Sequence, residues 1–173
     1  GSTGEPKLIA HTHRSILSSI QASKKTLNIT SSDTTLNWLP LDHAGPLIRC
    51  LLRDTLAQAK QIHAYPETIL SNPINWLRLV DKYTVTNTWA PNYAFQLAVE
   101  AAKNSENKLN LKLDSLKFIL NTGEPIIANT IITFYKIFKQ YGLKKNSIIT
   151  AWGMAETGSG ITFHKISDPE ELS

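Results

Sequence analysis

Five short apolar stretches recur along the chain of 173 residues, and their spacing constrains the fold more than any other feature. They cover residues 35–39, 61–64, 85–90, 116–120 and 148–152, roughly 25 to 32 residues apart. This is the spacing of successive βα units, in which a strand is followed by a helix and a return to the sheet. We therefore expect an α/β fold with a mostly parallel β-sheet and flanking helices.

The segments between these stretches carry helical patterns. Asn72-Pro73 predicts the start of one helix, and Gly142 predicts the end of another. Apolar residues at helical spacing predict a third helix whose buried face is formed by Leu47, Ile48, Leu51, Leu52 and Leu56. The polar segment 103–112 is expected to be a solvent loop, and the acidic segment 167–171 an irregular tail.

Composition excludes several classes of function. The formal charge of +4 comes from basic residues that are scattered along the chain, so we expect no nucleic-acid partner. Cys50 is the single cysteine, which excludes an internal disulfide and fits a reducing compartment. No apolar run approaches the ~20 residues of a membrane span. We expect a cytoplasmic protein without a membrane span.

The residues that follow the predicted strands are distinctive. The first strand is followed by a turn containing His43, the third by Pro91-Asn92-Tyr93, the fourth by Gly123-Glu124-Pro125 and the fifth by Gly153 to Thr157. In open parallel sheets, ligands bind beyond the carboxyl ends of the strands, so these turns are expected to share one ligand-binding edge. Each residue alone has a structural alternative, as a turn glycine, a packing histidine or a core tryptophan.

The opening segment, Gly1-Ser2-Thr3-Gly4-Glu5-Pro6-Lys7, has the composition of a phosphate-binding loop. Glycines allow close backbone approach, while hydroxyls, amides and an ammonium group bind phosphate oxygens. A cloning remnant or a frayed terminus is the alternative. Leu8 follows Lys7 where a P-loop has Ser or Thr, so an ordinary P-loop NTPase is disfavoured.

Together these residues suit ATP held across a sheet edge. Trp152 offers an aromatic face for a purine, Gly123 and Gly153 permit close approach, and Glu156 offers a hard oxygen ligand for Mg²⁺. His43, at a neighbouring strand end, is placed to lie beside a reacting carboxylate.

Four motifs in order resemble those of the adenylate-forming superfamily, which comprises acyl-CoA synthetases, fatty-acyl-AMP ligases, luciferases and the adenylation domains of nonribosomal peptide synthetases. They are the opening loop and the segments Trp38-Leu39-Pro40-Leu41-Asp42-His43-Ala44-Gly45, Asn121-Thr122-Gly123-Glu124-Pro125 and Trp152-Gly153-Met154-Ala155-Glu156-Thr157. The segment Pro91-Asn92-Tyr93-Ala94-Phe95 and Ala155 before Glu156 are most similar to fatty-acyl-AMP ligases and acyl-loading domains of polyketide and peptide synthetases.

The resemblance implies a reaction in which a carboxylic acid attacks the α-phosphate of Mg·ATP and the acyl-adenylate passes to an acyl carrier protein or CoA. By carry-over, Ser2, Thr3, Gly4 and Lys7 would hold the phosphates. The other roles would fall to Gly123, Glu124, Pro125, Trp152 and Gly153 around adenine, Glu156 at Mg²⁺ and His43 at the carboxylate.

Substrate class is also indicated. Ala44 stands where α-amino-acid adenylation domains usually place an ammonium-binding Asp, which favours a fatty or other simple acyl acid. By the same resemblance, the chain is expected to be the central piece of the large N-terminal domain, inactive without the C-terminal domain that bears the catalytic lysine. A degenerate nucleotide-binding or scaffolding module and an amino-acid-activating domain remain as alternatives.

Overall fold

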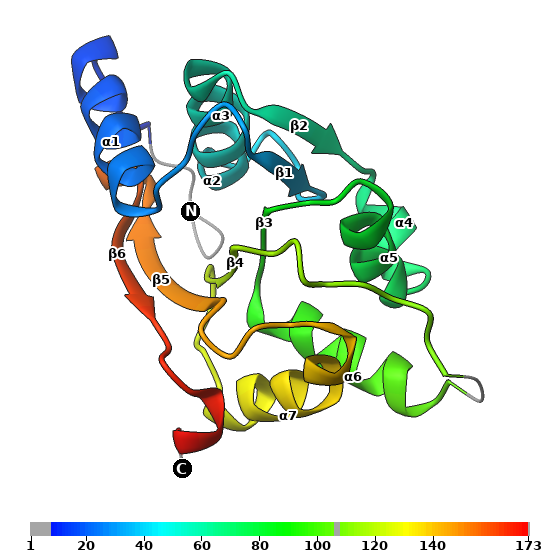
Figure 1. Cartoon of the computed structure of the whole chain (residues 1–173). Helices are drawn as coiled ribbons and strands as arrows, with labels where there is room; N and C mark the ends of the chain where they lie inside the picture. The colour runs from blue at the N-terminus through cyan, green and yellow to red at the C-terminus, as the bar shows by residue number, and fades with distance from the viewer. Residues whose placement is uncertain (1–7, 106–107, 173) are drawn as a thin grey trace.

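A six-stranded sheet forms the centre of the computed structural model, which describes residues 8–105 and 108–172 (Figure 1). The strands are β1 (Thr34–Asn37), β2 (Lys60–His63), β3 (Asn87–Ala90), β4 (Phe118–Asn121), β5 (Ile148–Met154) and β6 (Ser159–Lys165), in the spatial order β2-β1-β3-β4-β5-β6. Neighbours pair in parallel except β5 and β6, which are antiparallel. The expected α/β fold with a mostly parallel sheet is confirmed.

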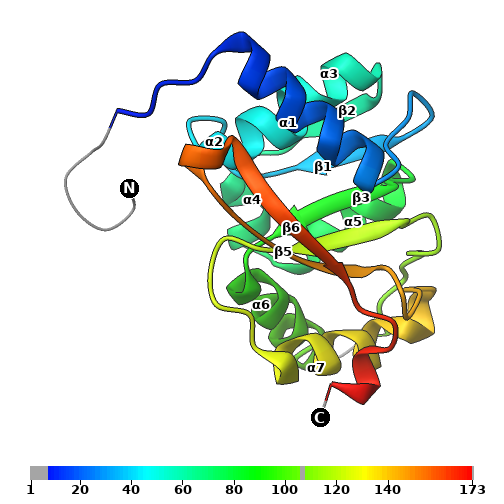
Figure 2. The ribbon, with the colours of Figure 1, turned by 90° about the vertical axis from the view of Figure 1, so that its left-hand side faces the viewer.

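Helices cover both faces of the sheet (Figures 1 and 2). One face is covered by α4 (Pro66–Leu70), α5 (Ile74–Lys82), α6 (Asn92–Lys103) and α7 (Ala128–Phe138). The other is covered by α1 (His13–Thr26) and a continuous helical segment made of α2 (Ala44–Pro46), the π-helical η1 (Leu47–Leu52) and α3 (Arg53–Ala57). Short 3₁₀ turns are η2 (Lys139–Tyr141), η3 (Ala155–Thr157) and η4 (Pro169–Glu171).

Strand β4 is buried on both faces, as parallel strands between two helical layers are. Ile119 faces the large core shared with α5, α6 and α7, where Trp76, Phe95 and Phe134 pack edge to face or tilted. Phe118 and Leu120 face the smaller core on the side of α1. This alternation fixes β4 in the middle of the sheet, next to the strand ends that carry the candidate site.

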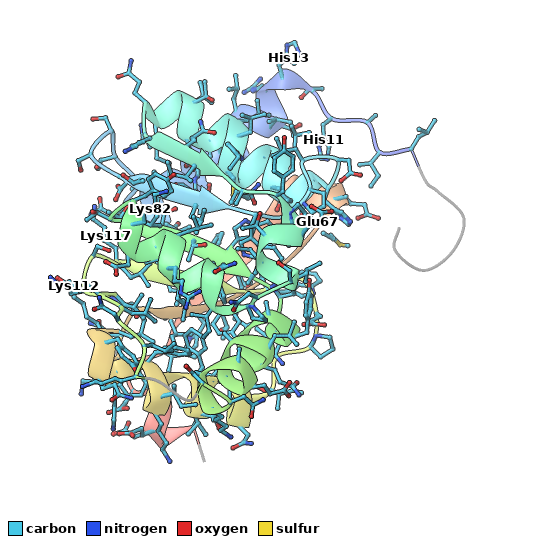
Figure 3. All side chains as sticks on the ribbon, turned by 90° about the vertical axis from the view of Figure 1, so that its right-hand side faces the viewer. His11, His13, Glu67, Lys82, Lys112 and Lys117 are labelled. Atoms are coloured by element: carbon cyan, nitrogen blue, oxygen red, sulfur yellow. The ribbon has the colours of Figure 1, made fainter. Side chains whose placement is uncertain are left out.

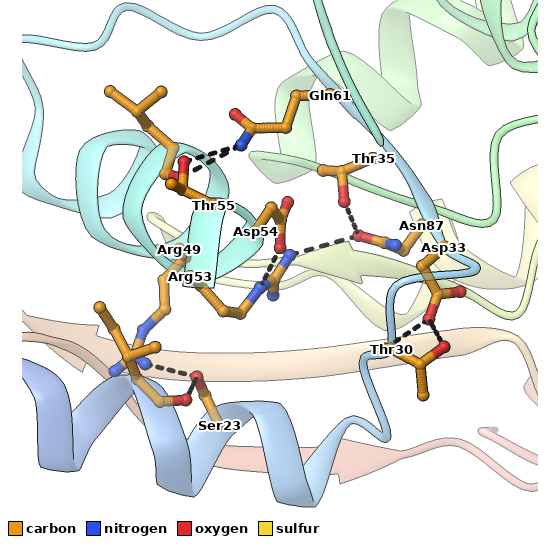
Figure 4. Close-up of polar contacts among 12 residues, drawn as sticks. Ser23, Thr30, Asp33, Thr35, Arg49, Arg53, Asp54, Thr55, Gln61 and Asn87 are labelled. Carbon is orange, nitrogen blue, oxygen red and sulfur yellow. Dashed lines mark hydrogen bonds and ion pairs between the residues drawn. The ribbon is translucent and has the colours of Figure 1, made fainter. Parts of the chain in front are cut away.

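The predicted apolar face of the segment 44–57 is confirmed at Ile48, which is buried, but is wrong for three other residues. Leu47, Leu52 and Leu56 are 38%, 37% and 50% exposed, while Arg49 and Arg53 point inward and are 8% and 2% exposed. The prediction assumed ordinary α-helical spacing, but residues 47–52 form a π-helix, whose wider turns shift the side chains that follow onto another face. Arg53 is accommodated by Asp54 at 2.6 Å and Asn87 at 3.3 Å (Figure 4).

Two elements had not been expected from the sequence. Strand β6 contains only two alternating apolar residues, Ile161 and Phe163, and it forms because the turn after η3 folds it back on β5. Helix α1 buries only Ile20 and Ser23. The sequence does contain signals for the ends of α1. Thr12 and Ser15 form a capping box at its start, and Lys24 and Lys25 lie in its last turn.

Three local expectations are refined. Helix α5 begins at Ile74, one residue after the predicted Pro73, and the Asn72 side chain accepts the Ile74 amide. In the predicted loop 103–112, Lys103 is the last residue of α6, the other described residues form no helix or strand, and Leu111 is buried. The acidic segment is not wholly irregular, because Pro169–Glu171 form the 3₁₀ turn η4, and Glu170 pairs with Lys139 at 2.9 Å.

Candidate functional site

The turns singled out in the sequence lie at one edge of the sheet. In the parallel registers, Ala90 pairs with Asn121, and Asn121 pairs with Thr150. Strand β1 lies on the other side of β3, and its last residue, Asn37, accepts a hydrogen bond from the Trp89 indole at 3.2 Å. The segments that follow β1, β3 and β4 therefore leave from the same edge, beside the extension of β5. We call this the carboxyl edge.

Strand β5 continues past its parallel partner. Its pairing with β4 ends at Thr150, and from Ala151 to Met154 it pairs only with β6. Trp152 lies in this extension and is 58% exposed, so the alternative of a core tryptophan is wrong. An indole exposed to this degree beside a sheet edge is available for stacking on a planar ligand.

Gly123 has the conformation and the surroundings of a ligand-facing glycine. Its φ is +95°, a region that side-chain-bearing residues rarely adopt. A Cβ placed on Gly123 would meet no atom of the described residues within 4 Å. The glycine is therefore required by the turn, and the space above it is open at the carboxyl edge.

The side chain of Glu124 has a structural partner. One of its carboxylate oxygens accepts a hydrogen bond from the backbone amide of Tyr93, at 2.5 Å, in the first turn of α6. Burial and the charge of Glu124 both raise the pKa of the Tyr93 phenol. The exposed Pro125 follows directly. The roles predicted for Glu124 and Pro125 toward adenine stay predictions, while the anchoring of this turn to α6 was missed in the sequence.

Two buried asparagines reinforce the same anchor. Asn121, at the end of β4, donates to Asn92 Oδ1 at 3.1 Å, and the amide of Ile127 donates to the same oxygen at 3.2 Å. Asn92 is the first residue of α6, so two segments that bracket the Gly123 turn are tied to one helix. Both asparagines are at most 3% exposed. The signal available in the sequence was their position, since Asn92 lies two residues after β3 and Asn121 is the last residue of β4.

His43 lies at the start of the helical segment 44–57, where its backbone is extended. Its side chain is exposed, and its amide donates to the Pro40 carbonyl at 3.3 Å. Gly45 nearby has a structural explanation, because a Cβ there would lie 2.8 Å from the Trp89 ring. The histidine is therefore presented at the carboxyl edge by a turn that packs closely on β3.

Gly153, which is predicted to contact ATP, is required by the pairing of β5 with β6. A Cβ on it would lie 2.2 Å from the Ser159 carbonyl oxygen, across the irregular pairing of β5 and β6. No L side chain fits there, so the glycine is explained by strand pairing alone, and its role toward ATP stays a prediction.

Glu156 lies in η3, directly after the extension of β5. Its side chain is exposed, and no hydrogen bond or ion pair engages its carboxylate within residues 8–105 and 108–172. The described residues hold no group of three or more His, Cys, Asp or Glu side chains that could form a metal cage. A single free carboxylate suits Mg²⁺, which is commonly bound by one or two carboxylates together with substrate phosphates.

The phosphate-loop residues Ser2, Thr3, Gly4 and Lys7 lie outside the described residues. The segment that follows them is attached to the η3 turn, since His11 Nε2 lies 2.7 Å from the Ala155 carbonyl oxygen. In Figure 3, His11 and Glu67 lie on one side of the molecule, whereas Lys82, Lys112 and Lys117 lie on the opposite side. These three lysines are therefore remote from the edge to which η3 belongs.

Two surface hollows lie apart from the Gly123 turn. One, of about 310 Å³, lies between the ends of α6 and α7 and is lined by Lys103, Lys108 and Tyr141. The other, of about 530 Å³, lies between α1 and β6 and reaches Thr157. Every helix in the described part of the chain is too short or too polar to cross a bilayer.

Cys50 is buried, and burial raises the pKa of its thiol to about 12.

A family model described as "AMP-binding enzyme" matches residues 1–173. Among curated relatives, an atromentin synthetase of Serpula lacrymans var. lacrymans (nps3) is 33% identical, over 100% of this chain and 18% of that protein. An inactive atromentin synthetase of Paxillus involutus (invA6) is 30% identical over 96% of this chain and 18% of that protein. The chain thus spans about a fifth of the length of these relatives.

Solved structures of adenylate-forming enzymes are also similar to this chain. The adenylation domain of a keto acid-selecting NRPS module bound to keto acyl adenylate is 31% identical, with a TM-score of 0.94 over 99% of this chain and 31% of that one. McyG A-PCP complexed with phenylalanyl-adenylate is 36% identical, with a TM-score of 0.93 over 99% and 27%. A fatty acyl-adenylate ligase from L. pneumophila is 28% identical, with a TM-score of 0.81 over 90% and 27%. Since the family model matches residues 1–173, the chain belongs to the AMP-binding enzyme family, the adenylate-forming superfamily that its motifs resemble.

Proposed function

We propose that this chain is the central part of the large N-terminal domain of an enzyme that activates a carboxylic acid as its acyl-adenylate. The observation that carries the proposal is the carboxyl edge, which brings together an exposed indole, an open glycine turn, a free carboxylate and a histidine. In the reaction, a carboxylate oxygen of the acid bonds to the α-phosphorus of ATP, the bond to the bridging oxygen breaks, and pyrophosphate leaves.

Different residues are proposed to bind different parts of ATP. Trp152 supplies a stacking surface for adenine, and the turn at Gly123 lets backbone approach the nucleotide closely. Ser2, Thr3, Gly4 and Lys7 are proposed to bind the phosphates, and Gly153 and Pro125 complete the nucleotide surface. Such a reaction depends mostly on positioning and charge neutralisation, which these groups provide without a covalent intermediate.

Glu156 is proposed to hold Mg²⁺ together with the phosphates of ATP. When bound, the ion neutralises charge on the phosphates and on the leaving pyrophosphate. Glu156 fits this role because its carboxylate is exposed and free of other partners in the described residues. His43 is proposed to line the site of the incoming carboxylate, where an imidazole orients the acid by hydrogen bonding.

The substrate is proposed to be an acid without an α-ammonium group. Ala44 follows His43 and provides no carboxylate to bind an ammonium ion. A fatty acid fits this condition, and so does a 2-oxo acid. The 2-oxo acid is favoured by the neighbour named for a bound keto acyl adenylate, which resembles this chain more in identity and TM-score than does the fatty acyl-adenylate ligase. The acceptor is proposed to be a carrier protein or CoA, within the cytoplasm.

Two alternative functions are each favoured by one of the comparisons. A degenerate module that binds nucleotide without chemistry is favoured by the relative named as inactive. An amino-acid-activating domain is favoured by the neighbour complexed with phenylalanyl-adenylate. For the first we expect nucleotide binding without turnover, and for the second a signal with amino acids alone.

The test is pyrophosphate exchange by the full-length protein that contains this chain, with fatty, 2-oxo, aryl and amino acids. We expect exchange with acids that lack an α-ammonium group, a large loss in Glu156→Gln, and no exchange by residues 1–173 alone. Exchange confined to amino acids would overturn the substrate class. ATP binding without exchange for any acid would support the degenerate module.

A further inference from the structure

Arg49 is a buried arginine without a carboxylate partner among the described residues. It lies in η1 and is 8% exposed. Burial and the charge of Arg53 lower its pKa to about 10, so it stays a cation at neutral pH. Burying a cation without an anion costs free energy unless hydrogen bonds satisfy its donors.

The two terminal nitrogens of Arg49 bind carbonyl and hydroxyl oxygens from two other segments, whereas its buried Nε has no partner among the described residues. Nη1 donates to the Ser19 carbonyl at 2.9 Å and to Ser23 Oγ at 2.6 Å, the contact drawn in Figure 4. Nη2 lies 2.6 Å from Ser19 Oγ and 2.9 Å from each of the carbonyl oxygens of Gly158 and Gly160. One guanidinium therefore joins η1, helix α1 and the start of β6.

The turn that it holds is conformationally unusual. Gly158 has φ of +68°, and the next residue, Ser159, has φ of +81° although it is not glycine. Such backbone persists only where the surroundings determine it, and it occurs often at functional sites. The Arg49 contacts fall on the carbonyls on either side of Ser159, and Ser19 Oγ also lies 3.3 Å from the Gly158 carbonyl.

Glu156 stands at the other end of the same turn. It belongs to η3 (Ala155–Thr157), and Gly158 follows η3 directly as its left-handed cap. The Thr157 hydroxyl lies 2.9 Å from the carbonyls of both Met154 and Ser159, which closes the turn internally. The direction of the Glu156 side chain therefore depends on where the residue 158–160 backbone is fixed.

We propose that Arg49 is a positioning residue: by binding the carbonyls of Gly158 and Gly160, it holds the η3 turn so that Glu156 presents its carboxylate to a divalent cation at the carboxyl edge. The inference rests on the metal role of Glu156 in the proposed function. Arg49 touches neither nucleotide nor metal. Its contribution is rigidity, because a planar guanidinium binds several acceptors at once in fixed directions.

The test uses the full-length protein with Arg49→Met, Arg49→Lys and Glu156→Gln, and Arg78→Met as the matched control. Arg78 is an exposed arginine of α5 that bonds only to Asn75 in the described structure. Two measurements are made: titration of Mn²⁺ in the presence of ATP by electron paramagnetic resonance, and hydrogen–deuterium exchange of residues 154–163.

We expect Arg49→Met to accelerate exchange of residues 154–163 and to weaken Mn²⁺ binding about 10- to 100-fold, the usual effect of losing a residue that supports a metal ligand. Arg49→Lys should recover part of the affinity, and Arg78→Met should match wild type. Adding Arg49→Met to Glu156→Gln should weaken Mn²⁺ binding no further, since both act through one carboxylate.

The outcomes separate the inference from the proposed function. If Glu156→Gln weakens Mn²⁺ binding and Arg49→Met does not, the inference is overturned and the metal role stands. If Glu156→Gln leaves Mn²⁺ binding unchanged, both fail. Pyrophosphate exchange does not enter either result. Should Arg49→Met fail to fold, Ser19→Ala, which removes one acceptor of Arg49 and a direct contact to Gly158, is expected to shift both measurements in the same direction by less; no shift would overturn the inference.

Discussion

The backbone amide of Tyr93 donates a hydrogen bond to the Glu124 carboxylate, so the turn after β4 is attached to the first turn of α6. The amides at a helix N-terminus lack intrahelical acceptors, and a carboxylate there also meets the positive end of the helix dipole. The α6 N-cap residue, Pro91, offers no side-chain acceptor, and Glu124, which lies 31 residues after Tyr93 in the sequence, supplies one. The residue thus links the stability of α6 to the shape of the Gly123 turn.

Glu124→Ala is therefore expected to lower the free energy of unfolding by about 1 kcal/mol, the usual cost of losing a helix cap. Denaturant unfolding measures the change. Glu100→Ala is the control, since Glu100 lies near the other end of α6 and its carboxylate bonds, among the described residues, only to Gln96 on the helix surface. An equal loss in both variants would contradict a special role for Glu124.

Gly123→Ala and Gly142→Ala form a matched pair, because both glycines have φ near +90°. Each substitution should cost about 1 kcal/mol of stability through backbone strain. Gly123 has open space at the carboxyl edge, whereas a Cβ at Gly142 would meet Asp114 at 3.1 Å. We expect only Gly123→Ala to raise the KM for ATP of the full-length protein. Similar KM values in the two variants would argue against nucleotide approach at Gly123.

The sequence predicts those parts of the fold and the site that depend on local patterns, and not those that depend on contacts between residues far apart in the sequence. The parallel strands and their edge follow from local apolar stretches and from turns at the strand ends, and both were predicted. The inward-facing Arg49 and Arg53 could not be predicted, because a π-helix leaves no periodic signal in the sequence and changes which side chains face the core. The Tyr93 to Glu124 bond is likewise invisible, since it joins residues that only the tertiary fold brings together.

Trp152→Ala is expected to weaken ATP binding while leaving stability nearly unchanged. The indole is 58% exposed, so its removal creates no buried cavity. Loss of stacking on a base costs about 1 to 3 kcal/mol, which corresponds to about 5- to 150-fold in the dissociation constant. Calorimetric titration of the full-length protein with ATP measures this, and Trp152→Phe should retain most of the affinity. A large fall in stability with unchanged ATP affinity would mean that Trp152 is a packing residue.

The last prediction concerns pH and the amino-terminal end of the sheet. Burial of Asp33 opposes its ionisation, but hydrogen bonds from Lys117, the Thr30 amide and Thr86 lower its pKa below the usual value. Figure 4 shows the contact of Asp33 with Thr30. Because the folded pKa lies below the unfolded one, the ionised carboxylate stabilises the fold above the unfolded value, about 3.9. This contribution is lost as the pH falls through the folded pKa.

Asp33→Asn should thus lower the free energy of unfolding at pH 7 by about 1 to 3 kcal/mol, the cost of leaving buried polar partners unsatisfied. As the pH falls below about 4, the wild-type protein loses its own contribution and the difference between the two proteins should shrink. Urea unfolding at a series of pH values measures this, with Asp114→Asn, at an exposed carboxylate, as the control. A difference that is independent of pH would show that Asp33 stabilises the fold through packing rather than through its charge.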